Sequence, residues 1–213
     1  ASHTYADGPD TYTITAYATD DDGGIGTATL TITVNNVAPS LGDVSATSVN
    51  EGDDCILTGT FTDPGVEDTF TLTVNWGDGS LPETFEYAAG TTEFSELHQY
   101  LDDNPSGTAS DDYEIIVTIE DDDLGSETAS TIVSVYNVDP TPTISGLPDV
   151  DEGALYTLTL SFTDPGTDTI VQWQIVWGDG DVDTFFTDIT SASHTYAEGP
   201  NTYTITVYAT DDD

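Results

Sequence analysis

The chain has 213 residues, of which 41 are Asp or Glu and none is Lys or Arg, so the formal net charge is −41 at pH 7. Nucleic acid and anionic membranes are excluded as electrostatic partners, because binding to either needs Lys or Arg against phosphate. The like charges repel one another in a compact state, so divalent cations, high salt or protons must neutralise them.

Enough apolar residues are present for a folded core. The chain contains 11 Tyr, 7 Phe and 3 Trp, which is not the composition of a disordered acidic segment. The single cysteine, Cys55, can form neither an intrachain disulfide nor a thiolate metal site. Its counterpart in the internal repeat described below is Tyr156, so we predict that Cys55 is a small core residue.

Alternation of hydroxyl and apolar residues predicts the strands. In chain order, it is clearest in residues 11–19 (TYTITAYAT), 27–34 (TATLTITV) and 155–162 (LYTLTLSF). A period of two with many β-branched and aromatic residues is typical of half-buried antiparallel strands. Gly, Pro, Asp and Asn separate such runs roughly every 8–12 residues, as in a sandwich. The pattern predicts an all-β chain of immunoglobulin-like antiparallel β-sandwiches.

The sequence repeats itself at two scales. A shift of 101 residues superposes four motifs, which are FTDPG at 61–65 and 162–166, WGDG at 76–79 and 177–180, V-x-E-G at 49–52 and 150–153, and N-V-x-P at 36–39 and 137–140. The first and last 22 residues differ at only three positions. We therefore predict three domains in a linear tandem array: residues 1–37 as the C-terminal part of one, 38–138 as a complete one, and 139–213 as one that lacks its final strand.

Two explanations for the incomplete last domain remain open. The favoured one is that the 213 residues are a window from a long tandem array. The other is that a neighbouring molecule supplies the strand by β-strand addition. Both predict head-to-tail contacts between neighbouring repeats or copies, which generate filaments.

The motifs V-x-E-G, F-T-D-P-G, W-G-D-G and H-x-Y, with a strand that ends in D-D-D and N-V-x-P at the junction, resemble the polycystic-kidney-disease (PKD) domain family. The resemblance covers essentially the whole chain. It implies a β-sandwich used as an extracellular spacer, an adhesive or surface-layer repeat, or an accessory module of a secreted hydrolase. Unlike typical members of the family, this chain has no Lys or Arg.

Acidic clusters carry the main functional signal. Three D-D-D runs close the strand that follows the H-x-Y turn, and the Asp of each FTDPG lies in another turn. Calcium takes six to eight hard oxygen ligands in flexible geometry, whereas magnesium demands a strict octahedron. The resemblance implies ligands from the domain entrance, the D-P-G loop and the acidic strand end. The predicted Ca²⁺ ligands are Asp20, Asp21, Asp22, Asn36, Asp63, Asp121, Asp122, Asp123, Asn137, Asp164, Asp211, Asp212 and Asp213.

The other motifs are given structural interpretations. The Trp of each WGDG and also Trp173 are predicted in the core, with Gly-Asp-Gly as a tight turn. His3, His98 and His194 recur at one repeat position, which indicates a structural His that bonds to the neighbouring turn. The carboxylates likewise recur with the repeat, unlike an active site in one cleft, so no enzyme activity is expected.

The sequence thus predicts a structural, calcium-binding segment of a secreted or cell-surface filament, stalk or giant adhesin. One alternative is a carbohydrate-binding or spacer module of a secreted hydrolase, with Tyr87, Tyr100 and Tyr136 as candidate exposed aromatics. Another is a halophile-type acidic surface protein without specific calcium sites. Membrane insertion is not expected, because the apolar runs are too short.

Overall fold

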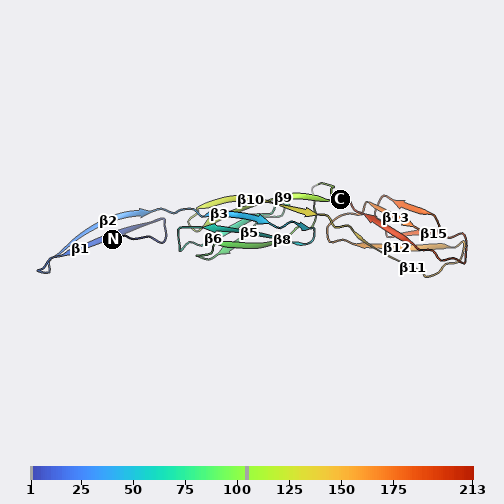
Figure 1. The fold of residues 1–213 in the computed structure, drawn as a ribbon, viewed down its shortest axis with the longest axis horizontal. Helices are drawn as coiled ribbons and strands as arrows, with labels where there is room; N and C mark the ends of the chain where they lie inside the picture. The colour runs from blue at the N-terminus through green and yellow to red at the C-terminus, as the bar shows by residue number, and fades with distance from the viewer. Residues whose placement is uncertain (1, 104–105) are drawn as a thin grey trace. The chain divides into compact units, whose positions relative to one another are not determined.

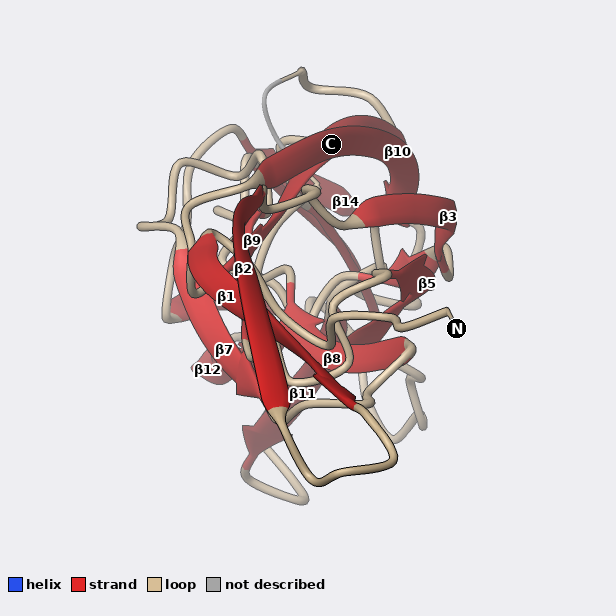
Figure 2. Ribbon diagram, turned by 90° about the vertical axis from the view of Figure 1, so that its left-hand side faces the viewer, coloured by secondary structure: helices blue, strands red, loops and turns tan. Residues whose placement is uncertain are grey.

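The computed structural model describes residues 2–103 and 106–213, and within these ranges the chain is all-β (Figures 1 and 2). Strands and loops make up the described residues, so no helix long and apolar enough to cross a membrane occurs among them. The strands form several small, mostly antiparallel sheets, as expected for tandem immunoglobulin-like domains. The predicted fold class is confirmed.

The chain divides into two compact units, which are described separately. The first comprises Ala1–Thr47, Ile56–His98 and Tyr113–Val133, and the second comprises Ser48–Cys55, Gln99–Asp112 and Ser134–Asp213. The domain boundary predicted after residue 37 lies inside the first unit, and the boundary predicted after residue 138 lies inside the second. Both boundaries stay predictions.

The first unit contains the larger part of most strands up to β10. Its hairpin of β1 and β2 forms a two-stranded sheet, the strands β3, β5 and β8 form a second sheet in that order, and β6, β7, β9 and β10 belong to a five-stranded sheet of order β4-β10-β9-β6-β7. The bounds are β1 Asp10–Thr19, β2 Ile25–Val34, β3 Ser40–Ala46, β5 Asp54–Thr62, β6 Phe70–Asn75, β7 Glu83–Tyr87, β8 Glu93–Gln99, β9 Ser110–Asp121 and β10 Ser126–Tyr136.

The second unit contains the short β4 and the strands from β11 onward. Two three-stranded sheets have the orders β11-β12-β15 and β14-β13-β16. The bounds are β4 Val49–Asn50, β11 Thr141–Gly146, β12 Leu155–Thr163, β13 Gln172–Val176, β14 Val182–Phe185, β15 Ser191–Thr195 and β16 Thr206–Thr210.

Alternate residues of each strand face the cores, as the period of two predicts. Along β5 the buried positions include Cys55, Leu57 and Phe61, with exposed residues between them. Along β12, Tyr156 and Leu158 are buried in the same way. Cys55 is therefore a core residue, as predicted.

Each WGDG turn is held by one conserved set of contacts within the chain. Trp76 and Trp177 are fully buried, and their indole N–H groups donate to Glu83 at 3.1 Å and to Asp183 at 2.9 Å. His98 stacks on Trp76 with a centroid distance of 4.5 Å, and its Nε2 lies 2.8 Å from Oδ2 of Asp78 in the turn.

The second turn repeats this arrangement. His194 stacks on Trp177 at 4.7 Å and lies 2.7 Å from Asp179, and this hydrogen bond lowers the pKa of Asp179. Gly77 and Gly178 both have positive φ, and a Cβ on Gly77 would lie 2.5 Å from the carbonyl oxygen of Glu114. The structural interpretation of the Trp and of these two His is confirmed.

Trp173 in β13 tests the importance of the core. It is fully buried, and its indole N–H donates to Asp188 at 3.1 Å. Trp173→Ala should lower the free energy of unfolding by about 4 kcal/mol, because it leaves a large cavity. Tyr208→Ala, at a 55% exposed position of β16, should change it by less than about 0.5 kcal/mol. Urea denaturation of both variants at one fixed calcium concentration measures this, and equal effects would contradict the assignment of the core.

Candidate metal centres

Each unit contains one cluster of carboxylates from loops far apart in the sequence. In the first unit, oxygens of Asp63, Asp68 and Asp121 all lie within 4.8 Å of one another, and so do oxygens of Asp7, Asp68 and Asp123. Asp68 belongs to both triads. We call these five residues the first cluster. They come from the loop before β1, the loop between β5 and β6, and the end of β9.

Backbone amides fix the orientation of the first cluster. Asp63 accepts a hydrogen bond from the amide of Gly65 at 2.7 Å, and Asp121 accepts from the amides of Asp123 at 3.0 Å and Gly125 at 2.7 Å. The other oxygen of Asp121 accepts from the side-chain amide of Asn36 at 2.9 Å. These bonds aim the carboxylates before any ion binds.

A small pocket adjoins the first cluster. Its volume is about 140 Å³, and Asp7, Asn36 and Asp68 are among the residues that line it. Asp68 is almost fully buried. Oδ1 of Asp7 and Oδ2 of Asp63 are buried without a hydrogen-bond donor, so space and free oxygens coincide here.

The second cluster consists of Glu51, Asp102, Asp103, Asp168 and Asp213. Oxygens of Glu51, Asp102 and Asp168 form one triad within 4.8 Å, and those of Asp102, Asp103 and Asp213 form another. Asp102 is shared, as Asp68 is in the first cluster. Glu51 and Asp103 are 1% and 0% exposed, so this cluster is buried deeply.

The same loops build both clusters. The amide of Val66 donates to the carbonyl of Ala6 at 2.9 Å, and the amide of Thr167 donates to the carbonyl of Leu101 at 2.9 Å. In each case the acceptor immediately precedes a cluster aspartate, Asp7 or Asp102. The repeat therefore reproduces the loop contact as well as the sequence.

The pairing of the next strand is also repeated. The amide of Thr69 donates to Asp122 at 2.8 Å, and the amide of Thr169 donates to Asp212 at 2.7 Å. Asp68 and Asp168 directly precede these two threonines. They are therefore equivalent positions of two equivalent clusters.

Carboxylate oxygens without a donor are concentrated around the second cluster. Those of the cluster are Oε2 of Glu51 and both oxygens of Asp103 and Asp168, and Asn137, Asp164 and Asp211 each contribute one more such oxygen. Burying an ionised carboxylate without a partner costs several kcal/mol. No Lys or Arg exists anywhere in the chain to pair with them. A hard-oxygen donor set of this kind fits Ca²⁺, which accepts many oxygen ligands in flexible geometry.

Burial and mutual repulsion raise the pKa of the cluster carboxylates. Burial, followed by the charges of Glu51 and Asp102, raises the pKa of Asp168 to about 8. Burial, followed by neighbouring charges, raises the pKa of Asp68 and of Asp103 to about 6. The clusters therefore favour a bound proton or cation over free negative charge.

The structure brings only some of the predicted ligands together. Asp63, Asp121 and Asp123 belong to the first cluster and Asp213 belongs to the second. Asn36 bonds to Asp121, while Asn137, Asp164 and Asp211 have the free oxygens described above. These residues stay predicted ligands.

Other members of the D-D-D runs lie elsewhere. Asp122 and Asp212 are exposed and bond to the threonine amides described above. Asp20, Asp21 and Asp22 are exposed at the turn between β1 and β2, where Asp20 accepts from the amides of Asp22 at 3.2 Å and Gly24 at 2.6 Å. Their role as ligands also stays a prediction.

Six cluster residues escaped the sequence analysis as ligands, namely Asp7, Glu51, Asp68, Asp102, Asp103 and Asp168. Glu51 belongs to the V-x-E-G motif, which gave a usable signal. Asp68 and Asp168 are hidden because the loops after FTDPG differ by one residue, so the shift of 101 pairs Glu67 with Asp168. Aligning the loops on Thr69 and Thr169 reveals the equivalence.

No known family profile matches the sequence, and no curated protein matches it. Three solved structures have a similar fold. Fibronectin(III)-like modules of Clostridium thermocellum CbhA are 17% identical with a TM-score of 0.32, over 82% of this chain and 86% of that chain. A tetra-tandem repeat in the extending region of a large adhesion protein is 17% identical with a TM-score of 0.38, over 94% of this chain and 55% of that one.

Dimeric latent PorU from Porphyromonas gingivalis is 12% identical with a TM-score of 0.34, over 92% of this chain and 20% of that chain. The chain thus spans about half of the adhesion-protein structure and a fifth of PorU. Likeness of this degree carries no conclusion about function. Membership of the PKD family stays a prediction.

The raised pKa values predict how stability depends on pH without metal. A carboxyl whose pKa is higher in the folded than in the unfolded state stabilises the fold fully below its unfolded pKa and loses this contribution as pH rises through the folded value. In chelator, stability should therefore fall between about pH 4 and pH 8, following Asp68, Asp103 and Asp168. Urea denaturation at successive pH values measures this, and stability that rises with pH across this window would contradict it.

Proposed function

We propose that the chain is a structural segment of a secreted or cell-surface filament, stalk or giant adhesin, in which Ca²⁺ joins successive domains. One observation carries the proposal: each cluster combines carboxylates from both sides of a predicted domain boundary. Asp7 precedes the boundary after residue 37 and Asp68 follows it, while Asp102 precedes the boundary after residue 138 and Asp168 follows it. A cation bound to either pair links one domain to the next.

Few direct contacts would hold such a joint without the ion. At the second boundary they include the amide of Thr167 bonded to Leu101 and the amide of Val138 bonded to Glu51 at 2.7 Å. A typical hydrogen bond contributes about 1 kcal/mol net. Two like charges 4 Å apart repel by about 4 kcal/mol at an effective dielectric constant of 20. Repulsion within an ionised, metal-free cluster therefore outweighs these bonds.

A divalent cation reverses the sign of this interaction. Residues that would hold it are those with oxygens converging at the cluster, above all Glu51, Asp102 and Asp168. The ion supplies charge neutralisation and fixed ligand geometry, and the short linkers with Pro39 and Pro140 leave few free torsions. Calcium is the expected ion because extracellular modules use it at submillimolar to millimolar affinity. The proposed role is mechanical, and catalysis has no part in it.

The carbohydrate-binding alternative has less support from the same structure. Of its three candidate tyrosines, Tyr100 is fully buried and the hydroxyl of Tyr87 donates to Glu96 at 2.5 Å. Tyr136 is 46% exposed. The trio therefore does not form one exposed aromatic face.

Thermal unfolding of the whole chain tests whether the sites select calcium. Millimolar Ca²⁺ should raise Tm strongly above the value in chelator, because ligands that bind only the folded state stabilise it. Mg²⁺ at matched ionic strength should raise Tm less, because it gives up its water reluctantly. Equal stabilisation by Ca²⁺, Mg²⁺ and Na⁺ would instead indicate a halophile-type acidic surface and overturn the calcium proposal.

Asp168→Asn should have effects of opposite sign with and without calcium. In chelator the variant should be more stable than the original chain, because one buried charge is removed from the cluster. In calcium it should be less stable, because one ligand is lost. Asp43→Asn, at an exposed position of β3, is the matched control and should change neither value appreciably.

Urea denaturation of both variants in both conditions gives the four comparisons. Loss of stability in chelator as well as in calcium would show that Asp168 has a different structural role. Asp68→Asn repeats the test at the first cluster.

A further inference from the structure

Strand β16 forms an edge of its sheet, whereas its counterpart in the five-stranded sheet does not. The order β14-β13-β16 corresponds to β7-β6-β9, but β9 continues to β10 and then β4. Register confirms the correspondence, since Ile175 pairs with Val207 in β16 and Val74 pairs with Val117 in β9. The outer side of β16 therefore lacks the neighbour that β9 has among the described residues.

Side-chain burial shows the same difference. The inward residues Ile115, Val117 and Ile119 of β9 are fully buried. Their counterparts Ile205, Val207 and Ala209, which follow by the loop equivalence of Asp121 with Asp211, are only partly buried against their core. The edge of β16 thus leaves an apolar face incompletely covered.

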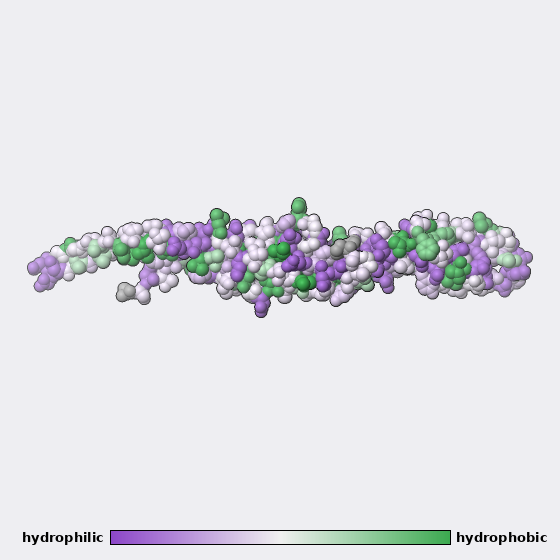
Figure 3. All heavy atoms as spheres, turned by 90° about the horizontal axis from the view of Figure 1, so that it is seen from above, coloured by the Kyte–Doolittle hydropathy of each residue, from purple (hydrophilic) through white to green (hydrophobic). Residues whose placement is uncertain are grey.

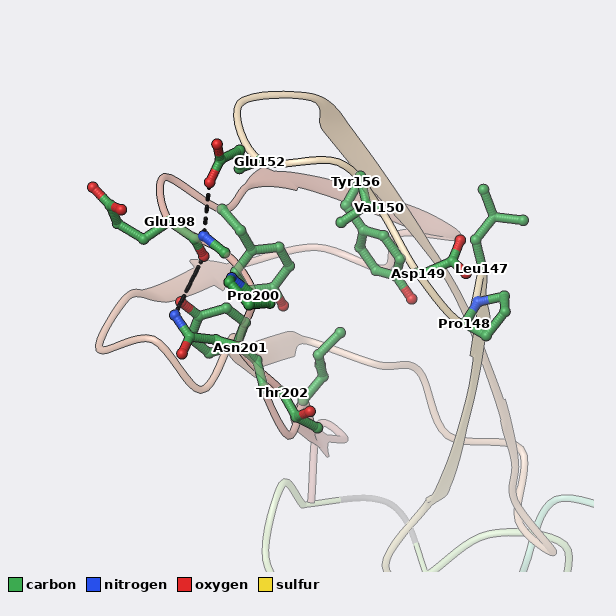
Figure 4. Close-up of a pocket in the computed structure, with 14 residues that line it drawn as sticks. Leu147, Pro148, Asp149, Val150, Glu152, Tyr156, Glu198, Pro200, Asn201 and Thr202 are labelled. Atoms are coloured by element: carbon green, nitrogen blue, oxygen red, sulfur yellow. Dashed lines mark hydrogen bonds between the residues drawn. The ribbon is translucent and has the colours of Figure 1, made fainter.

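A pocket of about 350 Å³ lies where the neighbouring strand would end. Figure 4 shows Leu147 and Pro148 on one side of it and Pro200, Asn201 and Thr202 on the other, and Val150 and Tyr203 also line it. Val150 is the repeat counterpart of Val49 in β4.

In the five-stranded sheet this place is filled by β10. Val135 of β10 pairs with Val49 of β4, and both Val133 and Val135 are fully buried. The pocket therefore corresponds in position to the end of a strand rather than to a small ligand.

The chain itself carries a strand that fits this edge. Residues 201–210 repeat β1 with only two differences, Asn201 for Asp10 and Val207 for Ala16. β1 already pairs with β2 over ten residues, in a register that includes Tyr12 opposite Ile32 and Ala16 opposite Ala28. Transferred to β16, this register places Ile32 opposite Tyr203 and Ala28 opposite Val207.

We propose that β2 of a second copy of the chain adds to the outer edge of β16 and inserts Ile32 and Val34 into this pocket. These two residues are the repeat counterparts of Val133 and Val135, which the complete sheet buries fully. The incoming strand keeps its backbone register and exchanges β1 for a partner of nearly the same sequence.

The exchange is favoured because the β1–β2 hairpin has little of its own to lose. Its apolar residues Ile14, Tyr17, Ile25 and Leu30 are 45–72% exposed, and Figure 3 shows hydrophobic patches along this hairpin. An isolated two-stranded hairpin is at best marginally stable in water. On β16 the same strand covers a sandwich core, so apolar burial increases while backbone bonding is kept.

The exchange also completes a cation site, and this step rests on the proposed function. Glu152 and Glu198 line the pocket, and they are the repeat counterparts of Glu51 and Asp102 of the second cluster. The segment after β2 would bring Asp68 of the second copy towards them, as Asp168 lies beside Glu51 and Asp102. The contact is heterologous, so it propagates into open head-to-tail oligomers.

Light scattering on the whole chain after size-exclusion chromatography tests the assembly. We expect the mean mass to rise beyond a dimer with protein concentration, in millimolar Ca²⁺ and in chelator with molar NaCl, both of which screen the charge of −41 per copy. Ile32→Asp should reduce the association constant at least tenfold, because it places a charge in an apolar pocket. Thr31→Asp, on the exposed face of the same strand, is the matched control and should associate like the original chain.

Disulfide trapping tests the register. Equimolar chains carrying Ala28→Cys and Val207→Cys should form a covalent dimer on mild oxidation, because paired strands bring Cα atoms within disulfide range. Ala28→Cys mixed with Tyr203→Cys, four residues out of register, should give several-fold less. Cys55 is buried and is present in both mixtures.

A monomer at every concentration, equal association of Ile32→Asp and Thr31→Asp, or equal trapping in both mixtures would overturn the proposal. The pocket would then be open to a ligand from solution. These outcomes are independent of the calcium proposal: a chain that stays monomeric but gains Tm selectively from Ca²⁺ keeps the sites and loses the strand exchange. Register-specific association without calcium selectivity has the opposite meaning.

Discussion

The absence of any basic side chain is the constraint on which the rest of the structure depends. In ordinary domains a buried carboxylate is paired with Arg or Lys, but here it can be paired only with a backbone amide, a proton or a cation. The fold nevertheless buries Glu51, Asp68, Asp103, Asp121 and Asp211. Folding itself therefore concentrates negative charge, and its stability depends on what the solvent supplies to neutralise that charge.

Local turn chemistry determines where the charge gathers. The first Asp of a D-D-D run accepts hydrogen bonds from amides two and four residues later, both at Asp20 and at Asp121. The Asp of FTDPG accepts one from the glycine two residues later, both at Asp63 and at Asp164. Because these bonds lie within single loops, the carboxylates are oriented by sequence-local geometry. An arriving ion meets ligands that are largely preorganised, which limits the entropy lost on binding.

Sequence periodicity was sufficient for the fold and for the core. Alternation along β5 and β12 places Cys55 and Tyr156 inside, and the repeated Trp and His positions are structural. Contiguous motifs also revealed Asp63, Asp121 and Asp123. Asp7 and Asp102 could not be found in this way, because each is a single acidic residue in a loop whose importance comes from a backbone contact with a distant loop. Such ligand sets are assembled by tertiary pairing, and no local pattern records which loops meet.

Sharing one carboxylate between two triads has a further physical consequence. Asp68 and Asp102 each lie within reach of two groups of oxygens, so protonation or substitution of either residue perturbs both triads of its cluster. Contributions of neighbouring ligands should therefore be strongly non-additive. In repeat proteins, stability is approximately the sum of terms within repeats and terms between neighbours. If the clusters bind cations across domain boundaries, the ion acts almost entirely on the terms between neighbours. Calcium would then control how far order propagates along the array, while the cores around Trp76 and Trp177 keep each sandwich folded.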